Sequence, residues 1–329
     1  MKKEKTRWFG IPKLFPYLKG YGRLVLADMI ALGFIGSAMD AVIPLFQQYA
    51  IDHFIADRTL AGLGAFVALY ILVMIVQTAT NCVSALAACK AEMYIGRDLK
   101  RVCFNHLQTL SFSYFNQNSV GYIHARVMSD TDKIATILAW GLMEAVWYVA
   151  YLALAIVMMF VLNWRLALCV MAIVPVLAVA SVYFQKKLVF HHRRVREQNS
   201  KITSGFNEGI TGAKTTKTLV IEEKMEREFR GLTGVMKRES VKEMHFRSLF
   251  MSTTAFAASA ALAVVLWQGG IITMRGAMLI GTLSVFVNYA QGMMEPIQWL
   301  VQVLSALTNV QVNVERFTKL METESDVRD

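Results

Sequence analysis

Polar side chains recur along one face of an apolar segment, residues 278–307, near the end of the chain. Their spacing alternates between three and four residues, which is the repeat of one helix face. A polar stripe facing lipid is costly, so it predicts either a water-filled cavity or polar packing between helices. We favour the cavity because the stripe is long. It consists of Ser284, Asn288, Gln291, Glu295, Gln298, Gln302, Ser305 and Asn309.

Acidic side chains lie within other apolar segments as well. Asp40 precedes Pro44 by one turn, and Glu144 has Trp147 nearby at helical spacing. The sequence leaves two interpretations open for each carboxyl, namely a functional role or an internal hydrogen bond that only stabilises the fold. Because the embedded ionisable groups are all carboxylates with aromatic neighbours, we expect a cationic, amphipathic substrate. The candidate cavity residues are Asp40, Gln77, Asn81, Glu144, Trp147, Asn288, Gln291, Glu295, Gln298 and Gln302.

The elements that must position these residues are six long apolar segments. Each exceeds the roughly 20 residues that cross a bilayer, and the chain is 55% hydrophobic. The sequence therefore predicts an all-α, polytopic membrane protein with six long transmembrane helices that extend into the cytoplasm. The segments are residues 24–48, 63–88, 137–161, 166–189, 248–274 and 278–307.

Lys and Arg are distributed very unequally between the two sides of these segments. Only Arg58, Arg165 and Arg275 fall on one side, and all the others fall on the opposite side. Because basic loops stay cytoplasmic, both termini and both long loops are expected inside, in a cell (inner or plasma) membrane. The net charge of +10 is interleaved with the spans, so no nucleic-acid partner is expected.

The two long loops are predicted to be helical hairpins. Charged and apolar residues mix without proline from Ala91 to Leu110, which indicates helix. A helix from about Arg165 to Phe206 would be roughly 60 Å long. The turn-forming residues of 114–121 and the glycines of 205–218 mark two cytoplasmic tips.

At these residues the chain resembles the transmembrane domain of ATP-binding cassette (ABC) exporters, of the six-helix, bacterial multidrug- or lipid-exporter kind. LFPYLKGYGR is similar to the elbow helix of that family, and RDLKRVCFNHLQTLSFSYFNQNSVGYIHARVMSDTDKI to its first intracellular loop. NEGITGAKTTKTLVIEEKMEREF is similar to the second loop, and ERFTKLME to the exit of the sixth helix.

The resemblance implies a division of the chain and a set of partners. Residues 1–23 would be the tail and elbow, 24–318 the transmembrane domain and 319–329 the start of a linker. Each tip would dock on a nucleotide-binding domain that carries ATP and Mg²⁺. A second transmembrane half, in a homo- or heterodimer, would complete the transporter. The coupling residues would be Phe115, Asn116, Asn118, Gly121, Glu208, Gly209 and Lys214.

The chain itself is expected to hold neither a cofactor nor a metal. Around Lys214, the positions that a phosphate-binding loop fills with glycine are Glu208 and Ala213. No catalytic residues and no metal site are expected, and the four cysteines lack metal-binding spacing. His191 and His192 read as part of a basic cluster at the inner membrane surface. We expect the ATPase domain to follow in a longer parent protein.

Three alternatives to a drug exporter remain. The first is a lipid or peptide exporter of the same fold. The second is a membrane scaffold or channel without ATP coupling. The third is a fragment that dimerises but does not transport.

Overall fold

The computed structural model describes residues 12–14, 16–17 and 20–325, and every regular element in these ranges is a helix. The all-α class predicted from the sequence is confirmed. Four helices in this part of the chain are long and apolar enough to cross a membrane: Leu24–Ile55, Leu63–Leu107, Val120–Met171 and Glu222–Met274. The count of six spans stays a prediction.

The chain divides into two compact units, which are described separately. The first consists of Met1–Ala167 with Val265–Asp329, and the second of Leu168–Val264. The third predicted span lies within the first unit, and most of the fourth lies within the second.

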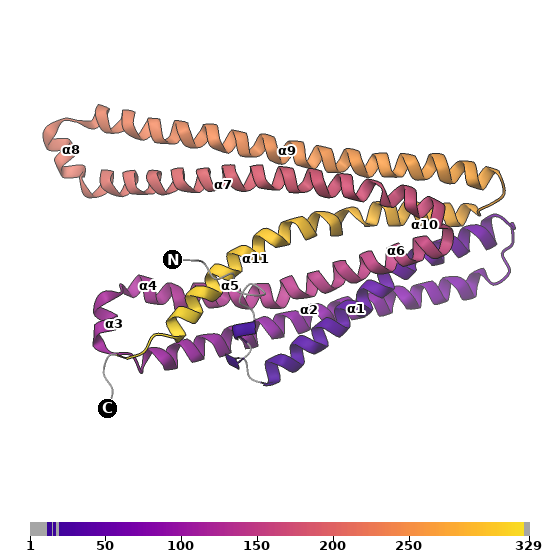
Figure 1. Ribbon diagram of the computed structural model, residues 1–329, viewed down its shortest axis with the longest axis horizontal. Coiled ribbons are helices and arrows are strands. Elements are labelled where there is room, and N and C mark those ends of the chain that lie inside the picture. Colours follow the sequence, from indigo (N-terminus) through magenta and orange to yellow (C-terminus); the bar gives the residue numbers. More distant parts are fainter. Residues whose placement is uncertain (1–11, 15, 18–19, 326–329) are drawn as a thin grey trace. The chain divides into compact units, whose positions relative to one another are not determined.

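The first unit opens with a helical hairpin. Helix α1 (Gly20–Tyr49) continues through one π-helical segment, η2 (Ala50–Ile55), and packs along α2 (Leu63–Leu107) (Figure 1). Gly62 begins α2 with a positive φ of 81°, a conformation that glycine adopts without a Cβ clash. With 45 residues, α2 is about 68 Å long, so it extends well beyond the predicted span.

Short helices follow α2 and lead into a second long helix. They are α3 (Phe112–Gln117), α4 (Val120–His124), η3 (Ala125–Asp130), α5 (Thr131–Thr136) and η4 (Ile137–Gly141), and they precede α6 (Leu142–Met171). Inside α6, Asn163 leaves helical geometry at φ −160° and ψ 101°. Its Oδ1 accepts from the Leu166 backbone N–H at 3.2 Å, which caps the next helical stretch. This turn lies between the third and fourth predicted spans.

Prolines interrupt two of the predicted helical segments, of which the sequence favoured a kink only in the last one, at Pro296. The predicted helix from Arg165 to Phe206 breaks at Ala172, and α7 then runs over Ile173–Thr211. Pro175 lacks the N–H that would bond to the carbonyl four residues earlier. For the same reason Pro296 cannot bond back to residue 292. The last predicted span is accordingly split into α10 (Ile280–Gly292) and α11 (Met294–Met321).

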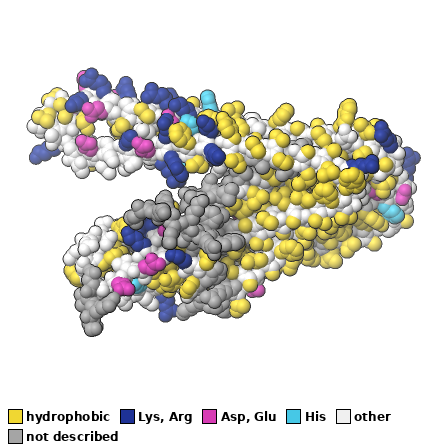
Figure 2. Space-filling model, in the orientation of Figure 1, with side chains coloured by type: hydrophobic (Ala, Val, Ile, Leu, Met, Phe, Trp, Pro, Cys, Tyr) yellow, Lys and Arg dark blue, Asp and Glu magenta, His cyan; other side chains and the backbone are white. Residues whose placement is uncertain are grey.

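The second unit is a long hairpin. Helix α7 leads through α8 (Ala213–Leu219) into α9 (Glu222–Met274), and α7 and α9 run side by side (Figure 1). A Cβ on Gly205 would touch Leu232 and Phe229 of α9. On the face that Figure 2 shows, Lys and Arg gather over the half nearest α8, and hydrophobic side chains cover the other half.

A hydrophobic core in the first unit joins α1, α2, α5 and α11. Ile95, Leu99 and Cys103 of α2 pack with residues of α5 and α11. The Tyr17 ring meets Phe317 edge-on at 5.4 Å, which ties part of the predicted N-terminal segment to α11. Most of residues 1–19 lie outside the described ranges, so the elbow helix stays a prediction.

Candidate functional site

Asp40 receives hydrogen bonds from two other helices. Trp147 of α6 donates its Nε1–H to Asp40 Oδ2 at 2.8 Å, and Gln77 of α2 donates its Nε2–H to Oδ1. Three predicted cavity residues from α1, α2 and α6 therefore meet at one carboxyl. Asp40 is half-buried, so this contact also joins the three helices.

Two further carboxylates bind aromatic donors between α6 and α11. Glu144 Oε2 accepts from Trp299 Nε1 at 2.8 Å, and Glu295 Oε1 accepts from the Tyr148 hydroxyl at 3.0 Å. Glu144 lies on α6 and its donor on α11, whereas Glu295 lies on α11 and its donor on α6. The two helices are thus linked reciprocally.

The aromatic donors also contact one another. The Trp147 and Tyr148 rings stack at 5.6 Å and 17°, and Tyr148 lies 5.2 Å from Trp299. We call these three aromatics, with their three carboxylates, the acidic–aromatic cluster. Glu295 is exposed, whereas Asp40 and Glu144 are half-buried. Carboxylates beside aromatic faces can hold an organic cation by charge attraction and cation–π contact.

The first part of the polar stripe contacts α1. Asn288 donates its Nδ2–H to Gln47 Oε1 at 2.7 Å, and Gln48 donates to Thr282 Oγ1 at 2.9 Å. The Gly281 N–H, at the start of α10, donates to Asp52 Oδ1 at 2.7 Å. Of the stripe itself, Asn288 therefore makes the polar helix packing that the sequence analysis named as the alternative to cavity lining.

The remaining predicted cavity residues differ in exposure. Gln291 is exposed and Gln298 is half-buried. Asn81 faces α1, because a Cβ added to Gly36 would lie 3.2 Å from its Oδ1. The Gln302 side chain lies outside the described part of the structure.

The first predicted tip is formed by α3 and α4. Asn116 lies within α3, Asn118 ends it and donates to the Tyr114 carbonyl at 2.9 Å, and Gly121 lies in α4. Several apolar side chains of this tip are exposed, including Phe115 at 42%. An exposed apolar tip is suited to docking against another protein surface.

The second predicted tip surrounds α8. Glu208 and Gly209 lie in the last turns of α7, and Lys214 lies in α8. Leu219 and Val220 beside them are 61% and 80% exposed. Both tips thus combine short helices with exposed apolar side chains.

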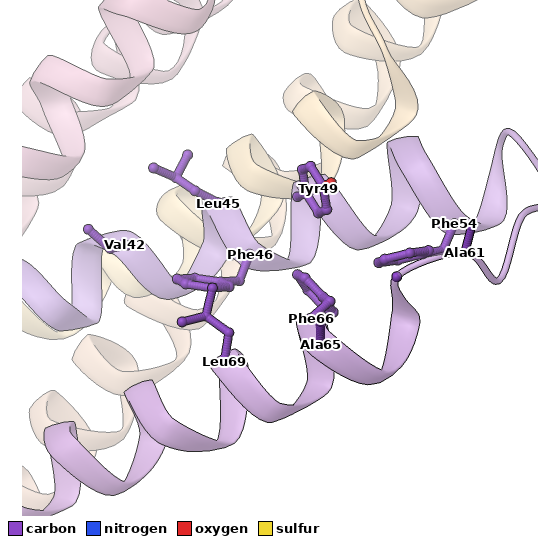
Figure 3. Close-up of a pocket in the computed structure, with 10 residues that line it drawn as sticks. Val42, Leu45, Phe46, Tyr49, Phe54, Ala61, Ala65, Phe66 and Leu69 are labelled. Carbon is purple, nitrogen blue, oxygen red and sulfur yellow. The ribbon is translucent and has the colours of Figure 1, made fainter.

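A separate apolar recess of about 470 Å³ lies between α1, η2 and α2. Aromatic rings form much of its wall, with Tyr49 and Phe66 stacked at 5.6 Å and Phe54 edge-on to Phe66 at 5.3 Å (Figure 3). None of its ten lining residues is charged. The recess was not foreseen from the sequence, and it contains no residue of the acidic–aromatic cluster.

The sequence analysis also omitted Tyr148 and Trp299 from the candidate site. Trp299 follows Glu295 by four residues, so it lies on the same helix face as the polar stripe. Tyr148 likewise follows Glu144 by four. Helical spacing from Glu144 had placed Tyr148 among its aromatic neighbours, and the same spacing from Glu295 was the signal that could have identified Trp299.

Comparisons with known proteins show the family of this chain. The family model of the ABC transporter transmembrane region matches residues 26–297, and the chain belongs to this family. The resemblance described from the sequence is therefore confirmed. Among the described residues, no group of three or more His, Cys, Asp or Glu side chains could hold a metal ion.

Several curated relatives are similar over nearly the whole chain. An uncharacterized ABC transporter ATP-binding protein of Bacillus subtilis is 26% identical over 98% of this chain and 54% of its own length. A protein of Staphylococcus aureus named "Putative multidrug export ATP-binding/permease protein" is 24% identical over 87% of this chain and 50% of its own. An ATP-dependent lipid A-core flippase of Vibrio cholerae is 21% identical over 98% and 55%. The chain spans about half the length of the curated relatives it matches.

Proposed function

We propose that this chain is the membrane-spanning part of an ATP-driven exporter that moves cationic, amphipathic molecules out of the cell by alternating access. The observation that carries the proposal is the acidic–aromatic cluster, with Glu295 exposed beside the Tyr148 and Trp299 rings. A cationic head group would bind the carboxylates and aromatic faces, and its apolar body would contact the surrounding helices. The names of two relatives, a multidrug exporter and a lipid flippase, support export.

The chain would cross the membrane six times with both termini in the cytoplasm. The distribution of Lys and Arg supports this orientation. Pro175 and Pro296 account for the breaks within the fourth and sixth spans. The boundaries 1–23, 24–318 and 319–329 remain our proposed division into elbow, transmembrane domain and linker.

Energy would enter through the two tips. The tip of α3 and α4 and the tip around α8 would each dock on a nucleotide-binding domain that binds ATP and Mg²⁺, as the ATP-binding names of the relatives suggest. Closure of these domains would move the tips, and the long helices α2, α7 and α9 would transmit that movement. A second transmembrane half would complete the cavity. Direction requires that the cargo bind the two states with different affinities.

Transport by the full-length protein in vesicles with ATP tests this function. Glu295→Gln keeps the shape of the side chain and its acceptor for Tyr148 but removes the charge. We expect the KM for a cationic dye to rise about tenfold, since hydrogen bonds to charged groups contribute about 1.5–3 kcal/mol. Transport of a neutral dye of similar size should be unchanged. An equal effect on both dyes would refute charge recognition.

A lipid exporter is the second candidate, favoured by the flippase relative. Flipping of a labelled phospholipid in the same vesicles separates the two. If lipid is moved and cationic dyes neither compete nor stimulate ATP hydrolysis, the cargo is a lipid. If neither cargo moves and no ATPase partner binds the tips, the scaffold or channel alternative holds.

A further inference from the structure

Helix α7 carries an exposed apolar stripe that ends in basic residues. Its valines at 176 and 179 are 68% and 72% exposed, and its aromatics at 183 and 190 are 56% and 50% exposed. The spacing alternates between three and four residues, so the side chains share one helix face. This face, the α7 stripe, consists of Val176, Val179, Tyr183, Lys186, Phe190 and Arg193.

The length of the stripe matches one leaflet of a bilayer. Val176 and Lys186 are ten residues apart, which is about 15 Å along a helix. A hydrocarbon core of about 30 Å has leaflets of that same depth. When the valines contact acyl chains, Lys186 and Arg193 therefore lie at the level of the head groups, with Phe190 between them.

The two basic residues are available for an anion. Neither Lys186 nor Arg193 forms an ion pair with a residue that the structure describes. The neighbouring carboxylates of α9 are already engaged. Glu239 lies 3.1 Å from His191 and 3.0 Å from Lys242, and Glu243 lies 3.0 Å from His192.

Arg194 strengthens this positive surface at one edge. Its guanidinium lies 4.5 Å above the Phe190 ring, and it also approaches Glu239 at 3.8 Å. Because Glu239 already pairs with Lys242 and contacts His191, it does not cancel the charge of the stripe. Basic side chains at the end of an apolar face attract anionic lipid at the membrane surface.

We propose that the α7 stripe binds an anionic phospholipid. One acyl chain lies along Val176 and Val179, and the phosphate lies between Lys186 and Arg193. The assignment to the cytoplasmic leaflet rests on the orientation given under the proposed function, whereas the binding itself does not. This lipid is a resident of the protein surface and is distinct from the exported cargo.

Native mass spectrometry of the full-length protein in detergent measures this binding directly. Phosphatidylglycerol and phosphatidylcholine of equal chain length are titrated separately, and bound lipid is counted. The test variant is Lys186→Gln with Arg193→Gln. At roughly 1 kcal/mol for each basic residue near the surface, the affinity for phosphatidylglycerol should fall about 30-fold. Binding of phosphatidylcholine should hardly change.

The matched control removes the same charge at the same level of the hairpin. Lys237 and Arg238 are exposed on α9, and at about 100° per residue Lys237 lies nearly opposite Glu239 on the helix and Arg238 lies to one side. Lys237→Gln with Arg238→Gln should leave the affinity for phosphatidylglycerol within about twofold. An equal loss in both double variants would show diffuse charge attraction and would overturn the proposed site.

Three other outcomes would also overturn it. Equal occupancy by the two lipids would remove the anionic preference. Displacement of the lipid by millimolar inorganic phosphate would indicate a site for free anions. Loss of lipid binding in Glu295→Gln would place the lipid in the transport site. If cationic transport fails its own test while the α7 stripe still binds phosphatidylglycerol, only the proposed cargo is wrong.

Discussion

The indole Nε1 of Trp147 lies 2.8 Å from Oδ2 of Asp40 and joins α6 to α1 through a carboxyl that α2 also contacts. Each of these side chains is polar within an apolar helix, where an unmet hydrogen bond costs several kcal/mol. The contact therefore both satisfies Asp40 and specifies how the three helices pack. It also positions the Trp147 ring to stack on Tyr148.

Trp147→Phe is expected to destabilise the protein. The substitution removes one donor from Asp40 and leaves a half-buried carboxyl oxygen without its partner, at a cost of about 1–3 kcal/mol. Thermal unfolding in detergent measures the effect. Trp267→Phe is the control, because Trp267 is 71% exposed. Equal shifts in the two variants would contradict the structural role of the indole N–H.

Gly281→Ala is expected to disrupt the contact between α10 and η2. A Cβ at this position would lie 2.5 Å from both Asp52 Oδ2 and the backbone carbonyl oxygen of Gln48, and a backbone atom cannot rotate away. Gly270→Ala is the control, since a Cβ there meets nothing within 4 Å. Replacing that helical glycine should stabilise the fold by about 0.5–1 kcal/mol. A stabilised Gly281→Ala variant would show that the two elements do not pack this closely.

Cys103 is expected to resist thiol reagents in the folded protein. Its side chain is fully buried, and this burial raises the pKa of the thiol to about 12. At pH 8.5, where an ordinary cysteine is half ionised, its thiolate is scarce. Alkylation followed by mass spectrometry in a variant with Cys82, Cys89 and Cys169 replaced by Ser should show labelling only after denaturation.

The same shift predicts a dependence of stability on pH. A pKa raised by folding favours the protonated thiol, so its contribution is complete below about pH 8.5 and declines as the pH rises towards 12. Cys103→Ser should lack this component of the alkaline destabilisation. If Cys103→Ser lost stability with rising pH in the same way as the unsubstituted protein, the predicted contribution of the Cys103 thiol would be contradicted.

The hairpin of α7 and α9 is expected to loosen in acid. Hydrogen bonds from Lys242 and His191 lower the pKa of Glu239. A lowered pKa stabilises the folded state above the ordinary value of about 4.3, and this contribution is lost as the pH falls through the folded pKa. Protection factors of amides near Glu239, which correct for the slower intrinsic hydrogen exchange in acid, should therefore fall below about pH 4. Glu239→Gln should show faster exchange already at pH 7, and its acid response should be weaker.

Much of the architecture could be predicted from hydropathy and helical periodicity. The long apolar segments, the helical continuation beyond residue 88 and the interruptions near residues 115 and 214 follow from local patterns, whereas short helices at those two tips were implied by the family resemblance. The break at Ala172 was missed, although it lies three residues before Pro175, which removes a backbone donor. A kink at Pro296 was expected for the same reason, and the break at Met293 lies three residues before that proline.

The candidate site was less predictable because its members come from distant parts of the chain. Periodicity along one segment grouped Asn288 with Glu295, yet the former contacts Gln47 and the latter Tyr148. Hydrogen-bond partners depend on which faces of two helices meet, and a single helical pattern contains no information about its neighbour.

Sequence alone determined the helical class, the family resemblance and the embedded carboxylates, since apolar length, charge distribution and local motifs are properties of the chain itself. Only the tertiary structure decided that Asp40, Glu144 and Glu295 each bind an aromatic donor from another helix. Those contacts join residues up to 155 positions apart, so they exist only once the helices have packed and each buried polar group has found its partner.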